Sequence, residues 1–320
     1  MPYFAIQSVR PQNMSVEVIN LTKKFGKQKA VDNISFSAKK GEILGFLGPN
    51  GAGKSTTMKI ATCYLQPSSG EVKVSGSNVV EHPLRIRKKV GYLPEHNPLY
   101  LEMYVHEYLN FISSVHGLSG GVKKDRIDNM IGLCGLVSEQ NKKIGQLSKG
   151  YRQRVGLAQS LIHDPEVLIL DEPTTGLDPN QIVEIRNVIR QISKEKTVIF
   201  STHIMQEVQA LCDRVVIINK GVIVADSNVV DLKTTADHDI LKLEFKEPID
   251  TAPILAFDSV IEINQTGELF YELKVNRGID LRSELFALAA KHNWPLVGLN
   301  QVEGSLEEVF RELTQKEVKK

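Results

Sequence analysis

The sequence predicts an α/β fold with a parallel sheet, followed by a second, smaller α+β domain. Three continuous apolar runs, at residues 43–47, 167–170 and 198–201, alternate with stretches of helical periodicity. This order is typical of parallel strands joined by helical crossovers. A glycine-rich segment separates the first run from the helix predicted after it. From about residue 237 the order of predicted elements changes, and the change marks the second domain.

The composition agrees with two domains and excludes several classes of protein. A chain of 320 residues is long enough for two domains, each with its own core. Lysine and arginine total 39 against 38 acidic residues, a net charge of +1, which gives no support for nucleic-acid binding. Cys63, Cys134 and Cys212 are isolated and lack metal-ligand spacing, so we expect buried thiols in a reducing compartment. No apolar run reaches the roughly 18 residues of a membrane-spanning helix.

Residues 48–56, GPNGAGKST, have the spacing G-x-x-x-x-G-K-[S/T] of a phosphate cradle. The glycines let backbone N–H groups turn toward the phosphates, and the helix predicted over 54–65 presents its positive N-terminus to them. Lys54 adds a mobile charge near the β- and γ-phosphates, and Ser55 offers a hydroxyl to Mg²⁺. The alternative is a plain glycine-rich turn, which a strand before it and a helix after it make improbable. We therefore expect this segment to bind a nucleoside triphosphate.

A second motif begins where the run 167–170 ends in Asp171 and Glu172. Carboxylates just past the end of a buried parallel strand lie at the ligand-binding edge of an α/β sheet. We expect Asp171 to hold Mg²⁺ through water and Glu172 to polarise a water for attack on the γ-phosphate. The alternative is that these residues only begin a loop; the phosphate cradle favours the catalytic interpretation.

The third motif is LSKGYRQR at residues 147–154, followed by apolar residues at helical spacing. Ser148 is a natural N-cap, so this segment predicts a second helix N-terminus that can receive an anion. One nucleotide needs only one such cradle. The sequence therefore raises the question of what the second one binds.

On these motifs the chain resembles the ATP-binding subunits of ABC transporters over about residues 15–230, with six motifs in the family's order. The resemblance implies a cassette at 15–232 with a RecA-like parallel core, an antiparallel β subdomain and a helical subdomain at 97–164. An N-terminal arm at 1–14, with Met14 as an alternative start, and a C-terminal domain at 237–320 complete the expected chain. The resemblance also implies two copies arranged head to tail, each signature segment closing over the γ-phosphate that the other copy binds.

The resemblance assigns roles to individual residues. Phe25 matches the aromatic that stacks on adenine, His203 matches the switch histidine, and Asp178 matches a loop near the partner's cradle. A lone histidine at a strand end is usually structural, but here its place in the series of motifs favours the switch. The implied catalytic residues are Lys54, Glu95, Glu172 and His203, and the implied Mg²⁺ ligands are Ser55, Glu95 and Asp171. The implied nucleotide contacts are Phe25, Val31, Asn50, Gly51, Ala52, Gly53, Lys54, Ser55, Thr56, Thr57, Ser148, Gly150 and Asp178.

Two positions depart from the family's pattern. Glu95 stands where relatives carry a glutamine, and a carboxylate there adds negative charge beside the γ-phosphate. Lys149 and Tyr151 stand where many relatives have glycine and glutamine. Because Ser148 and Gly150 are intact, we expect the signature to work.

The region 97–164 predicts mostly helix, over 104–116, over 123–136, and from the signature to about 163, with Gly117, Gly120 and Gly121 as breakers. In relatives the corresponding arm docks short helices of the membrane subunit. The tyrosines at positions 92, 100, 104 and 108 form either such a docking face or the packing of the arm itself. Both interpretations stay open on the sequence.

The C-terminal domain predicts the order β-α-β-β-α-β, a ferredoxin-like arrangement, after a hairpin at 215–224. The strands are expected at 240–245, 260–264, 269–275 and 296–302, and the helices at 253–257 and 281–293. A capping box at Ser305 predicts one more helix. No residue of this domain suggests chemistry, so we interpret it as a dimerisation or regulatory domain, with ligand sensing as the alternative.

The resulting expectation is an ATPase subunit that binds ATP and Mg²⁺, forms a homodimer and drives export through a separate integral membrane permease. We expect it in the cytoplasm, peripheral on the inner face of the cell membrane. The chain most resembles single-cassette bacterial exporter ATPases, and within these the gliding-motility-associated subunits. Multidrug, antibiotic or sodium export and a non-transport ABC ATPase are the alternatives. A P-loop kinase would leave the signature, Asp178 and His203 without purpose.

Overall fold

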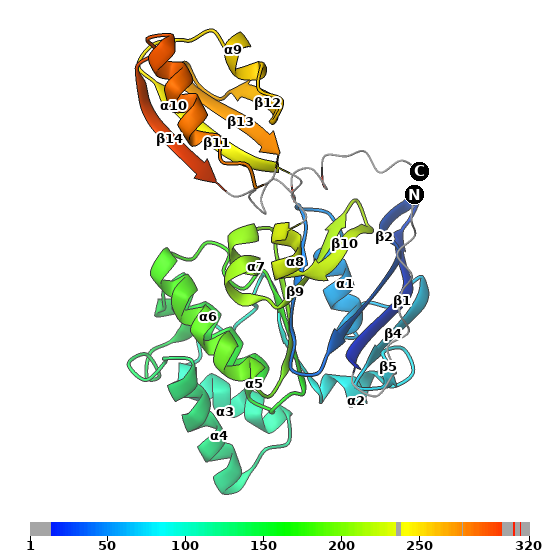
Figure 1. Ribbon diagram of the computed structural model, residues 1–320. Helices are drawn as coiled ribbons and strands as arrows, with labels where there is room; N and C mark the ends of the chain where they lie inside the picture. Colours follow the sequence, from blue (N-terminus) through cyan, green and yellow to red (C-terminus); the bar gives the residue numbers. More distant parts are fainter. Residues whose placement is uncertain (1–13, 235–237, 277, 303–309, 311–313, 315–320) are drawn as a thin grey trace. The chain divides into compact units, whose positions relative to one another are not determined.

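The computed structural model describes residues 14–234, 238–276, 278–302, 310 and 314 (Figure 1). The chain divides into two compact units, residues 1–227 and 228–320, each of which is described by itself. The predicted N-terminal arm lies outside the described residues, apart from Met14, which begins the first strand.

The first unit is built on a sheet with the strand order β10-β9-β3-β8-β7-β6. Its strands are β3 (Ile43–Leu47), β6 (Val90–Leu93), β7 (Val167–Asp171), β8 (Thr197–Thr202), β9 (Arg214–Asn219) and β10 (Val222–Asn228). The strands from β9 to β6 run parallel, as the apolar runs predict. Every residue of β3, β7 and β8 is buried. Because parallel strands end at the same edge, the segments after β3, β6, β7 and β8 meet there.

A second, antiparallel sheet covers the first, with the order β2-β1-β4-β5. It consists of β1 (Met14–Phe25), β2 (Gln28–Lys39), β4 (Ser69–Val74) and β5 (Ser77–Asn78). The two sheets and α1 (Lys54–Ala61) share one hydrophobic core, in which the rings of Phe36 and Phe46 lie 5.1 Å apart. Packing in this shared core holds the start of α1 next to the end of β3.

Three further helices complete the layers around the sheets. α6 (Pro179–Ser193) follows β7 and buries Ile185, Ile189 and Ile192, while α7 (Met205–Leu211) follows β8. α2 (Pro83–Arg87) precedes β6, and a two-residue turn at Lys220 and Gly221, both with positive φ, joins β9 to β10. The predicted hairpin at 215–224 is thus confirmed.

The helical subdomain contains α3 (Val105–Val115), α4 (Gly120–Leu133), a short 3₁₀ turn η2 (Ile144–Gln146) and α5 (Lys149–Leu161). The three α-helices pack on one another (Figure 1). Gly117 and Gly120 take left-handed φ values of +79° and +60° at the break between α3 and α4, as expected for helix breakers. One prediction is wrong: Gly121 lies inside the first turn of α4, which starts at Gly120 rather than at 123. Neither Gly120 nor Gly121 has a neighbour within 4 Å of an added Cβ.

The second unit has the element order β11 (His238–Phe245), α9 (Ala252–Leu255), β12 (Val260–Gln265), β13 (Phe270–Asn276), α10 (Arg282–Lys291) and β14 (Leu296–Val302), preceded by α8 (Val229–Thr234). The sheet is antiparallel, with the order β12-β13-β11-β14, so the predicted β-α-β-β-α-β order is observed. Both helices share one core with one face of the sheet. The other face carries the ion pairs Lys242–Glu272 and Lys274–Glu262. The helix predicted at Ser305 lies outside the described residues, apart from Phe310 and Thr314.

Candidate functional site

The segment after β3 forms a phosphate cradle in which some positions have room only for glycine. A Cβ on Gly48 would lie 2.3 Å from the carbonyl oxygen of Ile218, and one on Gly53 would lie 2.6 Å from that of Ala30. Gly51 and Gly53 take φ values of +76° and +111°, which other residues rarely adopt. No side chain among the described residues caps the N-terminus of α1. The first N–H groups of α1 are therefore available to an anion, which fits a phosphate.

The cradle opens into a cavity of about 550 Å³ at the carboxyl edge of the parallel sheet. The structure brings most of the predicted nucleotide and catalytic residues to this one cavity. Its lining consists of Ala30, Asn50, Gly51, Gly53, Lys54, Ser55, Thr56, Glu95, Glu172, Thr175 and His203. Ala30 and Thr175 were not predicted; the only available signal was that each neighbours a motif.

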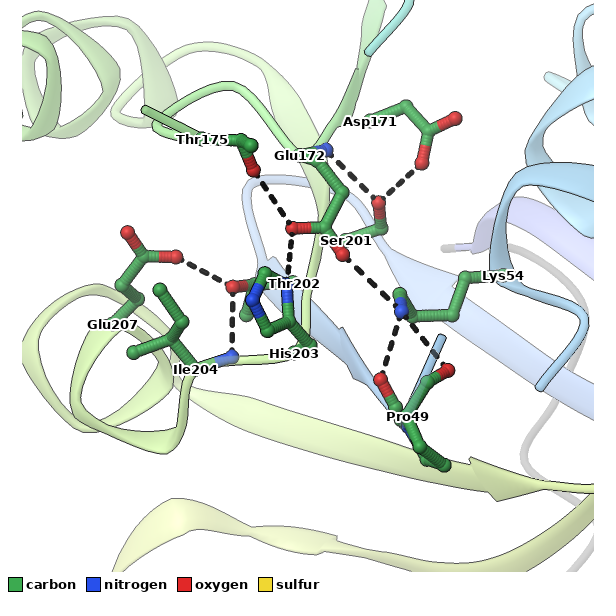
Figure 2. A network of polar contacts seen from close by, with 11 residues as sticks. Pro49, Lys54, Asp171, Glu172, Thr175, Ser201, Thr202, His203, Ile204 and Glu207 are labelled. Carbon is green, nitrogen blue, oxygen red and sulfur yellow. Dashed lines mark hydrogen bonds and ion pairs between the residues drawn. The ribbon is translucent and has the colours of Figure 1, made fainter. Parts of the chain in front are cut away.

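Lys54 lies at the floor of the cavity and is only 5% exposed. Its Nζ donates to the carbonyl oxygens of Gly48 and Pro49, at 2.8 and 3.3 Å. The same atom lies 3.2 Å from Oε1 of Glu172 (Figure 2). The ammonium is therefore held between the cradle and the end of β7.

Glu172 is 6% exposed and has φ +52°, in the left-handed region. Its N–H donates to the carbonyl oxygen of Ser201, at 3.1 Å. Its Oε2 accepts from Oγ1 of Thr175 at 3.2 Å and lies 2.8 Å from Nδ1 of His203. A strained backbone held by neighbouring strands is characteristic of functional sites. The carboxylate is thus fixed between a lysine and a histidine, facing the cavity.

Asp171, one residue earlier, is buried, and its hydrogen-bond partners among the described residues are hydroxyl groups. Oγ of Ser201, a residue that sequence reasoning missed, donates to Oδ1 of Asp171 at 2.6 Å. Burial raises the pKa of Asp171, hydrogen bonds from Ser201 and Ser55 oppose the rise, and the charges of Glu172 and Glu95 add to it. A buried carboxylate that has hydroxyl partners but no ion-pair partner among the described residues is stabilised by a cation.

The oxygen atoms of Asp171, Ser55 and Glu95 suit Mg²⁺, which prefers oxygen ligands. Among the described residues no cluster of three or more His, Cys, Asp or Glu side chains forms a complete metal cage. Mg²⁺ commonly binds through one or two carboxylates together with substrate phosphates, so the donor set fits.

The signature residues do not reach the cavity of their own chain. Ser148 caps α5 by accepting from the N–H of Tyr151 at 3.3 Å, and Asp178 caps α6 by accepting from the N–H of Gln181 at 3.0 Å. Gly150 packs against Gln181, whose Oε1 would lie 2.3 Å from an added Cβ. The two helix N-termini are therefore neighbours on a surface outside the cradle. A smaller cavity of about 390 Å³ separates α5 from the Glu95 loop.

Besides Ser148, Gly150 and Asp178, four further predicted nucleotide contacts do not line the cavity. Phe25 is half exposed, with Nζ of Lys23 at 5.2 Å from its ring centre. Val31 is fully buried, because side chains alternate along β2 and its neighbour Ala30 takes the position facing the cavity. Ala52 and Thr57 are buried, and Oγ1 of Thr57 donates to the carbonyl oxygen of Gly53 at 2.9 Å. They stabilise the cradle from beneath.

The four tyrosines predicted for the helical arm have two different kinds of surroundings, and Tyr92 lies in β6 rather than in the helical subdomain. Tyr108 is buried, and its hydroxyl donates to Gln159 at 2.6 Å, so it packs the subdomain. Burial raises the pKa of Tyr92, which packs against the core. Tyr100 and Tyr104, by contrast, are 57% and 47% exposed.

The comparisons with known proteins agree with this architecture. A family model described as "ABC transporter" matches residues 31–175. The linearmycin resistance ATP-binding protein LnrL of Bacillus subtilis is 34% identical over 300 residues, covering 92% of this chain and 96% of the relative. The bacitracin transport ATP-binding protein BcrA of Bacillus licheniformis is 39% identical over 208 residues, covering 64% of this chain and 67% of the relative. The chain belongs to the ABC transporter family.

Solved structures show the same fold. The structure of cbiO1 from Clostridium perfringens has a TM-score of 0.64 at 28% identity, covering 70% of this chain and 92% of that chain. A dimeric, post-hydrolysis cassette named MJ0796, bound to ADP and Pi, has a TM-score of 0.62 at 26% identity, covering 67% of this chain and 98% of that chain. The protein is therefore an ATP-binding subunit of an ABC transporter, in a family whose cassettes hydrolyse ATP. No helix among the described residues is long and apolar enough to cross a membrane.

Proposed function

We propose that this chain is the ATPase subunit that powers export through a separate permease. The observation that carries the proposal is the position of the Glu172 carboxylate, which lies between Lys54 and His203 at the cavity above the phosphate cradle. A carboxylate at the end of a cradle can orient a water toward the terminal phosphate of a bound nucleotide.

The surrounding residues supply the rest of the chemistry. Lys54 balances the charge of the phosphate oxygens, and His203, hydrogen-bonded to Glu172, stands where it can contact the γ-phosphate. Asp171, Ser55 and Glu95 would hold Mg²⁺, which neutralises charge that develops on the phosphate oxygens. The backbone N–H groups of the cradle orient the triphosphate.

A head-to-tail homodimer would complete the site. Ser148 and Gly150, at the start of α5, do not line the nucleotide cavity of their own chain, and neither does Asp178, which caps α6. In a pair of copies each signature would close over the nucleotide of the other. The dimeric cassette among the similar structures supports a dimer.

The permease would dock on the helical subdomain. Its exposed apolar side chains include Tyr100, Leu101, Tyr104 and Phe111, and the rings of Tyr100 and Phe111 lie 5.8 Å apart. An aromatic cluster exposed to solvent suits a partner surface. Membrane attachment would then come from that partner.

The names of two relatives support one class of exported compound. LnrL and BcrA are named for linearmycin resistance and bacitracin transport. We therefore favour export of antibiotic-like compounds over a role in gliding motility, which stays a prediction from resemblance. Co-purification of a multi-span permease, followed by drug-sensitivity and cell-spreading assays of the deletion strain, separates the two.

The central test compares purified wild type with Glu172→Gln. We expect the variant to bind ATP with a Kd within about twofold of wild type and to lose at least ~100-fold in phosphate release. Light scattering should show an ATP-dependent dimer that persists in the variant. Glu166→Gln, at the opposite end of β7, is the matched control and should keep wild-type turnover. Rapid hydrolysis by Glu172→Gln would contradict the assigned role.

A further inference from the structure

A buried carboxylate lies behind the switch histidine, and the proposed reaction does not use it. Glu207, in the first turn of α7, is only 1% exposed. Its Oε2 accepts from Oγ1 of Thr202 at 2.5 Å (Figure 2). Its Oε1 is buried without a hydrogen-bond partner among the described residues. Burying a carboxylate with so few partners costs stability, so its presence requires a reason.

The hydroxyl of Thr202 connects this carboxylate to the backbone around His203. Thr202 ends β8 and is fully buried. Its Oγ1 accepts from the N–H of Ile204 at 3.1 Å while donating to Glu207. Its carbonyl oxygen also accepts from the N–H of Gly48, the first glycine of the cradle, at 3.3 Å. The residues on both sides of His203 are therefore fixed by one short chain of hydrogen bonds.

His203 itself has little packing to hold it. Its side chain is 40% exposed, and the hydrogen bond from its Nδ1 to Glu172 depends on the direction in which the backbone presents the ring. The turn between Thr202 and Glu207 contains His203, and its backbone sets the direction of the imidazole ring. A loss of either partner would free the turn without touching the nucleotide cavity, which neither residue lines.

Ordinary helix capping does not explain Glu207. A capping carboxylate accepts a backbone N–H at the helix start, as Glu107 does in α3, where Oε2 accepts from the N–H of Tyr104 at 3.2 Å. The carboxylate of Glu207 instead meets the side chain of Thr202, in the interior of the protein.

We propose that Glu207 is a positioning residue for ATP hydrolysis: through Thr202 it holds the His203 turn so that the imidazole meets Glu172. This inference deepens the proposed function and rests on it. The hydrogen-bond acceptor at position 207 and the hydroxyl at position 202 act as one unit. Removing either should misplace His203 and slow turnover while nucleotide binding persists.

The test uses the full chain with Glu207→Leu and Thr202→Val, which keep the packing volume and remove the hydrogen bond. Glu207→Gln and Thr202→Ser are the conservative variants, since an amide oxygen still accepts and a serine still donates. Glu107→Gln is the matched control for a first-turn carboxylate. The readouts are kcat, the Kd of a fluorescent ATP analogue, the Tm, and the ¹⁵N imidazole signal of His203, assigned with His203→Gln.

We expect Glu207→Leu and Thr202→Val each to lower kcat about tenfold with Kd within about twofold, and to shift the His203 signal. The double variant should lose no more than about tenfold, because the two residues form one interaction. Glu207→Gln and Thr202→Ser should recover most of the lost kcat. Glu107→Gln should leave kcat and the His203 signal as in wild type.

Two results would overturn the inference. An unchanged His203 signal in both Glu207→Leu and Thr202→Val would show that the turn does not depend on them. If the fold losses of kcat in the two single variants multiply in the double variant, the two residues act independently. Because the His203 signal is recorded without nucleotide, it is informative even if wild type fails to hydrolyse ATP, a failure that would count against the proposed function alone.

Discussion

Asp171 and Glu172 are adjacent carboxylates with opposite surroundings. Glu172 meets the ammonium of Lys54 and the imidazole of His203, whereas the hydroxyl of Ser201 donates to Asp171. Because Asp171 ends β7 and Glu172 is the next residue, the two side chains point to different sides and meet different neighbours. Of these two buried carboxylates, Glu172 therefore has an ion-pair partner, whereas Asp171 has hydrogen bonds from hydroxyl groups and no ion-pair partner among the described residues.

Asp171→Asn should stabilise the nucleotide-free protein at neutral pH. The pKa of Asp171 is raised, so above that pKa the ionised carboxylate opposes folding, whereas below the ordinary pKa of about 3.9 it is protonated in both states. We expect Tm to rise by about 2–4 °C at pH 7, the shift that roughly 1 kcal/mol gives in a domain of this size. Calorimetry at several pH values should show the gain fading toward pH 4. A lower Tm at pH 7 would contradict the explanation.

Glu95→Gln should keep ATPase activity and change its metal dependence. Glu95 lines the cavity beside Ser55 and Glu172, and its carboxylate adds negative charge near the γ-phosphate site. The neutral variant should need more Mg²⁺ for half-maximal activity, with kcat within about tenfold of wild type. Phosphate-release assays over a Mg²⁺ titration measure this. Loss of nearly all turnover would contradict the prediction.

At the scale of elements, two stacked histidines connect the helical subdomain to the parallel sheet. His116 caps α3, and His163 follows α5; their ring centres lie 4.0 Å apart. Nε2 of His163 donates to the carbonyl oxygen of Val90 in β6, at 3.1 Å, and its Nδ1 is buried without a partner among the described residues. Burial lowers the pKa of His163 to about 4 and also lowers that of His116; Arg126 of α4 adds to the shift of His163, and Asp164 opposes it.

His163→Gln should reduce the sensitivity of the protein to mild acid. Because the folded pKa lies below the unfolded value of about 6.5, the unfolded chain binds the proton first and stability falls as the pH drops from about 6.5 toward 4. A glutamine can still donate to Val90 but does not titrate. We expect the loss of Tm between pH 7 and pH 5 to shrink by about 2–4 °C. Exposed His82→Gln is the control; equal effects of both substitutions would refute the explanation.

At the scale of the molecule, the two units have separate cores. The core around β3, β7 and β8 contains residues from Val16 to Ile218, and the core of the second unit contains residues from Leu241 to Ala289. All the residues that line the nucleotide cavity belong to the first unit. The second unit is therefore free to serve dimerisation or regulation, as we propose for it.

A chain that ends at Ser227 should fold and bind ATP with a Kd within about twofold of the full chain, because it keeps the entire cavity and its core. If the second unit promotes dimerisation, the truncated Glu172→Gln variant should need a higher protein concentration to dimerise with ATP. Equilibrium binding and analytical ultracentrifugation measure the two quantities, with Lys54→Ala as the non-binding control. A truncated chain that unfolds would show that the units depend on each other.

The sequence by itself determined the parallel core, the phosphate cradle and the carboxylates after β7, because these rest on local patterns: continuous apolar runs, obligatory glycines and residues adjacent in the chain. It also determined the β-α-β-β-α-β order of the second unit. It misplaced the start of α4, since glycine near a helix end is nearly neutral and local propensity cannot settle the boundary.

Only the tertiary structure decided which side chains meet around the site. Ser201 contacts Asp171, Thr202 contacts Glu207, and Ala30 rather than Val31 faces the cavity. The first contact joins strands 30 residues apart in the chain, and the second depends on the turn between β8 and α7. The third depends on strand register, where a shift of one residue reverses the side that each side chain faces. Local sequence specifies the residues of the cradle, whereas the position of His203 depends on contacts between strands and helices.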